Sequence, residues 1–251
     1  MDAWYHYLLL VGVGFVVGFI NTVAGGASLI SLPVLIFLGL PPAVANGTNR
    51  VAIALQTAIA VAGFKSKGVS TFPFNIYLGG AALLGSIIGA SIAVDIRGET
   101  FNRILAIIMV VVVLIIVFKT KVRIDELQER ITGKYRWIGM LAFFFIGIYG
   151  GFINAGIGFV IILFLHYVHR LSLVRANATK VAVVFIYTLA ALIVFVLNDK
   201  VIWKVGLILA LGNGLGAWFS SRISVSKGDG YIKIFLVGMV IVMAIKLWFF
   251  T

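Results

Sequence analysis

Long apolar stretches separated by short polar segments occupy almost the whole chain. Most of these stretches match the roughly 20 residues that an α-helix needs to cross the hydrocarbon core of a bilayer. Hydrophobic residues make up 62% of the chain and charged residues 11%, against roughly 45–50% and 25% in soluble domains. The sequence therefore predicts an all-α, polytopic transmembrane helix bundle. The apolar stretches are 4–40, 43–64, 74–94, 104–118, 137–168, 176–197, 201–219 and 232–250.

Two of the stretches, 4–40 and 137–168, are too long for one crossing and contain small residues near their middle. The interruptions are AGGA at 24–27 and AGIG at 155–158. Lipid offers no partner to a free backbone N–H or C=O group, so an irregular segment at membrane depth must lie within protein or against a water-filled cavity. We therefore predict a broken helical hairpin in each stretch, with both breaks facing the interior of the bundle.

Short motifs in the first half of the chain recur in the second half in the same order. Three matches spaced over about 130 residues indicate an internal duplication, which is a common plan for transporters. The matching pairs are GFIN at 18–21 and 151–154, ANGT at 45–48 with ANAT at 176–179, and Gly85/Gly89 with Gly212/Gly216. The sequence thus predicts a first transmembrane repeat at 1–118, a basic cytoplasmic linker at 119–136 and a second transmembrane repeat at 137–251.

The distribution of positive charge predicts how the repeats are oriented. If each broken stretch returns to the side from which it entered, three spanning helices remain in each half and the most basic loops share one face, as the positive-inside rule requires. An odd number of crossings makes the repeats inverted and places both termini outside. The residues expected inside are Lys65, Lys67, Arg170, Arg175, Arg222, Lys227 and those of the linker, whereas Arg97, Arg103, Lys200 and Lys204 remain outside.

The formal net charge of +12 would suggest a nucleic-acid partner in a soluble chain. Here the basic residues lie between apolar stretches, so we expect a lipid bilayer and no nucleic acid around the protein. No Lys or Arg precedes the first apolar stretch and no small-residue cleavage site follows it, so we expect no removable signal peptide. The sequence leaves open whether copies form a homo-oligomer.

Two basic residues, Arg50 and Lys180, lie inside helices predicted to begin near Pro41 and Ser172. At 1.5 Å per residue both side chains start about 12 Å along their helices, near the middle of a roughly 30 Å core. All eight acidic residues fall in loops or termini, so neither cation has an evident carboxylate partner. Each long side chain could snorkel to a membrane surface, but an intramembrane charge indicates function by default. We therefore expect a small anionic substrate to supply the missing negative charge.

Polar side chains and helix breaks near these cations complete the predicted site. A helix that begins near Ala27 or Ser28 would present free N–H groups and the positive end of its dipole at membrane depth, which favours an anion. The glycines could instead serve only to let helices pack closely. The predicted substrate-binding residues are Asn21, Gly25, Gly26, Ser28, Asn46, Thr48, Arg50, Gln56, Asn154, Gly156, Asn177, Thr179 and Lys180.

The segments NTVAGGASLI at 21–30 and GLPPAVANGTNR at 39–50 resemble the sulfite exporter TauE/SafE family. The similarity covers nearly the whole chain, since YGGF at 149–152 and VRANATK at 174–180 resemble the other stretch that recurs in the family. The resemblance implies a bacterial or archaeal cytoplasmic-membrane transporter, often of sulfite or organosulfonates, with export as the usual direction.

We therefore expect a multi-pass transporter of the cell membrane that moves a small anion, such as sulfite or an organosulfonate, by alternating access. An anion-selective channel and a transporter of another small solute remain alternatives. The chain has no cysteine, no His-Glu-x-x-His, no Gly-x-Ser-x-Gly and no P-loop, so we expect no enzyme activity, no metal site and no cofactor. The lack of intramembrane carboxylates also argues against a proton relay.

Overall fold

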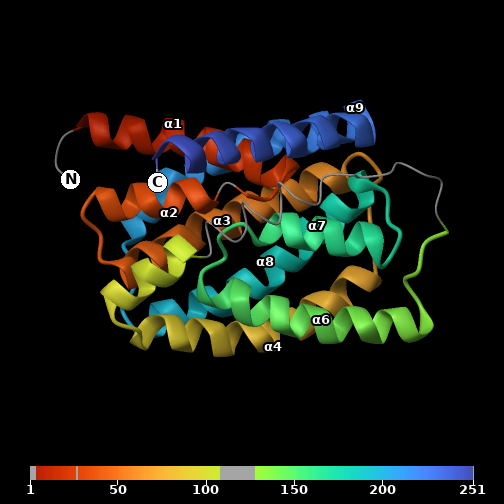
Figure 1. Ribbon diagram of the computed structural model, residues 1–251, viewed down its shortest axis with the longest axis horizontal. Coiled ribbons are helices and arrows are strands. Elements are labelled where there is room, and N and C mark those ends of the chain that lie inside the picture. The colour runs from red at the N-terminus through yellow and green to blue at the C-terminus, as the bar shows by residue number, and fades with distance from the viewer. Residues whose placement is uncertain (1–3, 27, 108–127, 251) are drawn as a thin grey trace.

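The computed structural model describes residues 4–26, 28–107 and 128–250, and the regular structure in these ranges is entirely helical (Figure 1). Residues 98–107 are helical, while most of the predicted stretch 104–118 and of the linker, as well as Ala27, lie outside the described residues. Within the described ranges, α1, α4, α6 and α8 are each long and apolar enough to cross a membrane. The helices are α1 (Trp4–Val23), α2 (Ser28–Phe37), α3 (Pro42–Lys65), α4 (Phe74–Asp95), α6 (Gly133–Phe152), α7 (Ile157–Tyr167), α8 (Leu173–Leu197) and α9 (Trp203–Phe250).

Both predicted interruptions are present, and each is followed by a short helix. Helix α1 ends at Val23 and α2 begins at Ser28, whereas α6 ends at Phe152 and α7 begins at Ile157. In Figure 1, α1 and α2 form a hairpin that enters from the left end of the bundle, and α6 and α7 form one that enters from the right. The backbone N–H of Gly158 donates to the carbonyl oxygen of Gly25 at 3.1 Å, so the tips of the two hairpins meet.

Each hairpin packs against a long helix from the other half of the chain: α1 lies along α9, and α6 lies along α4. A Cβ atom on Gly18 would lie 2.1 Å from the carbonyl oxygen of Asn213, and one on Gly151 would lie 2.1 Å from that of Ser86. Only glycine fits at such close backbone contacts, which are common between membrane helices. Because Gly18 and Gly151 each begin a GFIN motif, the repeated motif makes the same kind of contact in both halves.

The C-terminal helix differs from the sequence prediction. The pattern predicts separate crossings at 201–219 and 232–250 with Arg222 and Lys227 in a loop. Helix α9 does break between these stretches, at Gly228, but Arg222 and Lys227 lie in the helix before the break. Its non-helical backbone angles occur at Gly228, where φ is 71°, a value that glycine adopts without steric cost. Ser221 is buried and packs against Gly63 of α3, whereas Lys227 beside the break is exposed.

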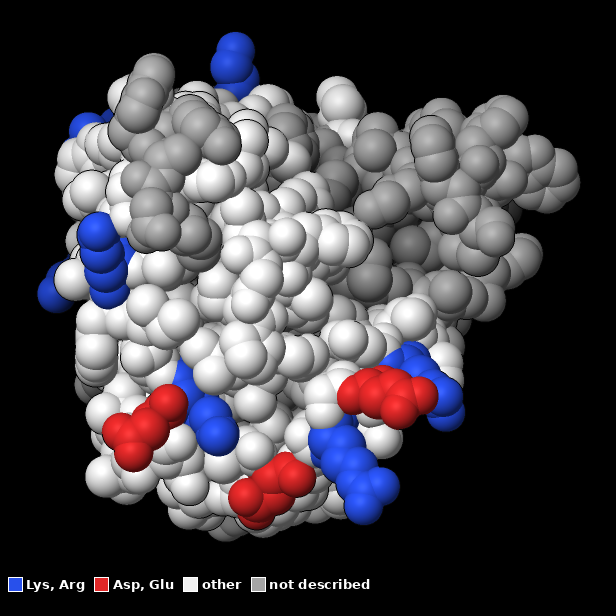
Figure 2. Space-filling model, turned by 90° about the vertical axis from the view of Figure 1, so that its left-hand side faces the viewer, with Lys and Arg blue, Asp and Glu red and all other residues white. Residues whose placement is uncertain are grey.

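The two ends of the bundle carry charge, and the surface between them is apolar. The segments that precede α6 and α8 meet at the right end of Figure 1. Between them, Arg175 pairs with Glu129 at 2.7 Å and the N–H of Arg130 donates to the carbonyl of His169. Figure 2 shows the opposite end, where acidic and basic side chains lie close together. A band of exposed apolar side chains between charged ends fits contact with lipid. It includes Leu8, Phe15, Leu84, Leu141, Phe145, Ile193 and Leu211.

The predicted cap of α8 is present, because the Ser172 hydroxyl accepts a hydrogen bond from the N–H of Arg175 at 3.2 Å. We expect Ser172→Ala to lower the free energy of unfolding by about 1 kcal/mol, the usual contribution of such a cap. Thermal unfolding in detergent, followed by tryptophan fluorescence, measures this change. Ser91→Ala on the exposed face of α4 is the control, and an equal loss of stability in both variants would contradict the assignment.

Candidate functional site

Arg50 and Lys180 are both buried, with exposed fractions of 0% and 2%. The two terminal nitrogens of Arg50 donate to the carbonyl oxygens of Gly150 and Gly151 at 2.6 and 2.8 Å. The Lys180 ammonium donates to the carbonyl oxygens of Asn21 and Thr22 at 2.9 and 3.0 Å. Carbonyls in the last turn of a helix lack intrahelical partners and form the negative end of the helix dipole. Each cation therefore stabilises the C-terminal end of a hairpin helix from the other half of the chain.

Two asparagines complete these contacts. The amide of Asn46 donates to the carbonyl oxygen of Phe152 at 2.6 Å, and that of Asn177 donates to the carbonyl oxygen of Val23 at 3.1 Å. Phe152 and Val23 are the last residues of α6 and α1. In both halves, then, an asparagine binds the final carbonyl of the helix and a cation binds the two carbonyls before it.

Sequence analysis found no evident carboxylate partner for either cation and left the counter-charge to an anionic substrate. Their partners are backbone carbonyls at helix ends, which a search of the sequence for carboxylates does not reveal. The ion pairs found within the described ranges are Arg103 with Glu99 and Arg175 with Glu129, so neither buried cation takes part in one. The snorkelling alternative is also excluded, because neither side chain reaches the surface.

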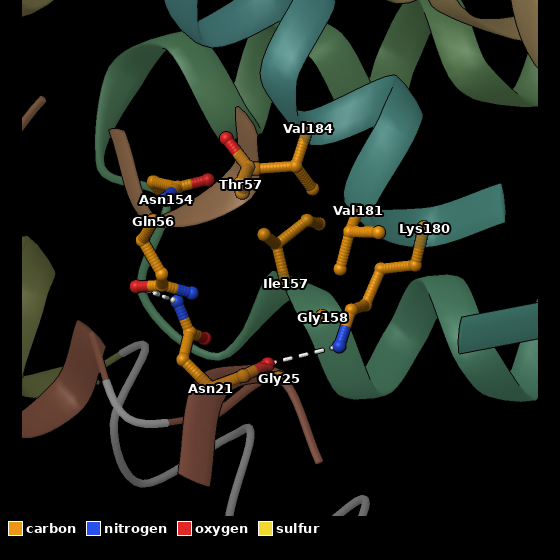
Figure 3. A pocket seen from close by; sticks show the side chains of 10 residues that line it. All are labelled: Asn21, Gly25, Gln56, Thr57, Asn154, Ile157, Gly158, Lys180, Val181 and Val184. Carbon is orange, nitrogen blue, oxygen red and sulfur yellow. Dashed lines mark hydrogen bonds between the residues drawn. The ribbon is translucent and has the colours of Figure 1, made fainter. Parts of the chain in front are cut away.

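A small cavity lies where the two hairpin tips meet α3 and α8 (Figure 3). Its volume is about 10 Å³, which is room for about one water molecule. A sulfite ion does not fit into a space of this size. The lining residues are Asn21, Gly25, Gln56, Thr57, Asn154, Ile157, Gly158, Lys180, Val181 and Val184.

The two asparagines of the GFIN motifs are held in this cavity by matching contacts. Asn21 donates to the Gln56 side-chain oxygen at 3.3 Å, as Figure 3 shows, and Asn213 donates to the same oxygen at 3.2 Å. The Tyr187 hydroxyl donates to the side-chain oxygen of Asn154. Gln56 and Tyr187 lie ten residues beyond Asn46 and Asn177 respectively, so they occupy corresponding positions on α3 and α8.

The helix breaks add positive potential at the same depth. Helices α2 and α7 begin beside the cavity, and Gly156 enters α7 with a φ of 72°. Helix N-termini attract anions through their free N–H groups and dipoles. The opposing negative ends of α1 and α6 are neutralised by Lys180 and Arg50. The Lys180 ammonium group lines the cavity, and no acidic side chain in the described ranges does.

The structure brings together only some of the predicted site residues. Five of them line the cavity: Asn21, Gly25, Gln56, Asn154 and Lys180. Those that instead hold helix ends or form the breaks beside the cavity are Gly26, Ser28, Asn46, Arg50, Gly156 and Asn177.

Thr48 and Thr179 lie away from the cavity, toward opposite ends of the bundle. The Thr48 hydroxyl accepts from the N–H of Ile202 at 3.0 Å, and the Thr179 hydroxyl bonds to that of Thr71 at 2.8 Å. Each threonine therefore links its helix to a loop, Thr48 to the one before α9 and Thr179 to the one after α3.

Sequence analysis missed several residues of the site. Thr57, Ile157, Gly158, Val181 and Val184 line the cavity, and Tyr187 and Asn213 orient the polar side chains that do so. Comparing the two halves position by position could have identified Tyr187, because it corresponds to Gln56. The apolar lining residues could not be recognised from the sequence, because they resemble the other residues of the hydrophobic stretches. Among the described residues, no cluster of three or more His, Cys, Asp or Glu could hold a metal.

Comparison with known proteins gives matches over nearly the full length. The sequence profile described as "Sulfite exporter TauE/SafE" matches residues 10–247. A Haemophilus influenzae protein named "Probable membrane transporter protein" is 29% identical over 239 residues, covering 95% of this chain and 93% of the relative. The Escherichia coli "Probable membrane transporter protein YfcA" is 29% identical over 246 residues, covering 95% and 90%. No solved structure matches the chain.

Proposed function

The chain belongs to the sulfite exporter TauE/SafE family of membrane transporters, and we propose that it carries a small oxyanion, sulfite or an organosulfonate, out of the cytoplasm by alternating access. The proposed setting is the cell membrane, crossed several times. The end that contains Lys65, Glu129 and Arg175 faces the cytoplasm in this proposal, because basic segments gather there.

The proposal rests on the position of the Lys180 ammonium at the small cavity between the hairpin tips, here called the central cavity (Figure 3). An ammonium group has three hydrogen-bond donors, and two of them bind the carbonyls of Asn21 and Thr22. One donor remains for a ligand. With helix N-termini nearby and no carboxylate among the described lining residues, the site favours a small anion over a cation.

Two features support alternating access by inverted repeats. The hairpins enter from opposite ends of the bundle and meet at Gly25 and Gly158, and matching residues in the two halves hold the two helix ends. Rocking of one repeat against the other would separate the hairpin tips and open the central cavity to one side at a time. A cavity with room for only about one water molecule favours such a carrier over a continuous pore.

Uptake of labelled sulfite and methanesulfonate into proteoliposomes tests the proposal. We expect flux that saturates with concentration, that unlabelled oxyanions inhibit, and that choline, a small organic cation, does not affect. Flux that rises without saturation, together with unitary currents in planar bilayers, would indicate a channel. Rates equal to those of protein-free liposomes for every oxyanion tested would refute anion transport.

A further inference from the structure

A second and larger cavity opens at the basic end of the bundle. Its volume is about 310 Å³, and it lies between the C-terminal part of α3, the loop that follows it, the start of α4 and α8. Pockets that bind small molecules start at roughly this size. Lys65, Ser70 and Asn75 supply polar groups to it, and Phe64, Ala178 and Ala182 supply apolar surface.

The larger cavity lies next to the central one along the same two helices. Thr57 and Val181 line the central cavity, and Phe64 and Ala178 line the larger one. Buried Phe64 packs in one cluster with Ala178 and Val181. A solute that passed from the larger cavity to the central one would therefore have to cross a thin apolar layer centred on Phe64.

The opposite end of the bundle is closed at the corresponding position. Phe195 lies 18 residues beyond Asn177, just as Phe64 lies 18 beyond Asn46, and Gly47 corresponds to Ala178. A Cβ atom on Gly47 would lie 2.1 Å from the carbonyl oxygen of Lys200 and 3.0 Å from the Phe195 side chain. Backbone and aromatic ring thus fill the place beside Gly47 that corresponds to the cavity beside Ala178.

The polar groups of the larger cavity are those of an anion site. Lys65 is exposed and forms no ion pair with an acidic residue in the described ranges. The Ser70 oxygen accepts from the N–H of Phe72 at 3.3 Å, which leaves its hydroxyl hydrogen to donate. Asn75 lines the cavity, its side-chain oxygen is buried without a partner, and no hydrogen bond from its NH2 group is found within the described ranges.

Thr71 also lines the cavity, but it has no donor to offer. The Thr179 hydroxyl donates to the carbonyl of Arg175 at 2.8 Å, so Thr71 must donate its own hydrogen in the bond to Thr179. This bond joins the loop after α3 to α8 beneath the cavity. The groups available to an anion are therefore Lys65, Ser70 and Asn75.

We propose that this cavity is a second anion-binding site, in which Lys65, Ser70 and Asn75 hold a sulfonate or a similar small oxyanion before the Phe64 layer opens to the central cavity. The choice of a sulfonate as the ligand rests on the proposed function. Binding at this cavity is measured without transport, so a negative result here would not refute anion transport, and a negative transport result would not refute this site.

The absence of native cysteine allows a direct test with single cysteines. Ala182→Cys places a thiol in the cavity, and Val61→Cys is a second reporter in case the first folds poorly. The two are labelled with an anionic and a cationic methanethiosulfonate reagent in detergent. We expect Lys65→Gln to lower the ratio of the anionic to the cationic labelling rate by roughly tenfold, because a charge a few ångströms away acts oppositely on the two reagents. Methanesulfonate should slow labelling when Lys65 is present and not in the Lys65→Gln variant.

Two controls distinguish a specific anion-binding site from the general effect of positive surface charge on the labelling rates. Lys67→Gln removes a charge two residues away that does not line the cavity, and it should leave the ratio at Ala182→Cys nearly unchanged. Asn198→Cys at the opposite end should not respond to Lys65→Gln. A ratio unaffected by Lys65→Gln, an equal response to Lys67→Gln, or an absence of protection by methanesulfonate would each overturn the proposal.

Discussion

Replacing Lys180 with glutamine is expected to lower anion flux by roughly 10- to 100-fold at low substrate concentration. A hydrogen bond to a charged group contributes about 1.5–3 kcal/mol, and each 1.4 kcal/mol corresponds to a factor of ten. Lys180→Arg should retain part of the flux because it keeps the charge and the donors. Initial rates of labelled sulfite or methanesulfonate uptake, measured over a range of concentrations, separate the effect on KM from that on maximal rate.

The matched control is Lys67→Gln, which removes an exposed lysine at the basic end that lines neither cavity. It should transport at the wild-type rate. Because Lys180 also stabilises the end of α1, the thermal unfolding of each variant is compared before its rate is interpreted. A Lys180→Gln variant that is folded and transports at the wild-type rate would show that Lys180 does not bind the anion.

Much of the fold follows from the amino-acid sequence. Apolar length predicts the membrane helices, and the small residues at 24–27 and 155–158 predict the two breaks, because few other sequences allow the backbone to leave a helix at membrane depth. The course of α9 could not be predicted in this way. Hydropathy predicts that its two segments are separate but not where the break lies, because Arg222 and Lys227 resemble loop residues and yet lie in the helix before Gly228.

The site was predicted in outline but not in its electrostatics. Burial of Arg50 and Lys180 follows from their depth along α3 and α8. Their partners do not, because a helix C-terminus becomes a negative group only once the chain has folded and presents its last carbonyls. The same limit applies to Tyr187 and Asn213, whose polar atoms acquire a role only when α8 and α9 place them beside the GFIN asparagines.

Arg50→Met is expected to destabilise the protein by about 2–6 kcal/mol, because two buried carbonyls lose their donors at a cost of about 1–3 kcal/mol each. Methionine fills much of the arginine volume, but it leaves the carbonyls of Gly150 and Gly151 buried and without the donors that bind them. It also removes the contact of the guanidinium with the Phe195 ring. Thermal or denaturant unfolding followed by tryptophan fluorescence gives the change.

Arg103→Met is the matched control, since Arg103 pairs with Glu99 while both side chains are largely exposed, and such pairs contribute little to stability. Arg50→Lys, which keeps the charge, should lie between wild type and Arg50→Met in stability. Because Arg50 does not line the central cavity, we expect Arg50→Lys to leave the KM for the anion near its wild-type value. If Arg50→Met instead leaves the unfolding transition unchanged and raises KM, Arg50 is a ligand of the anion and not the residue that holds the end of α6.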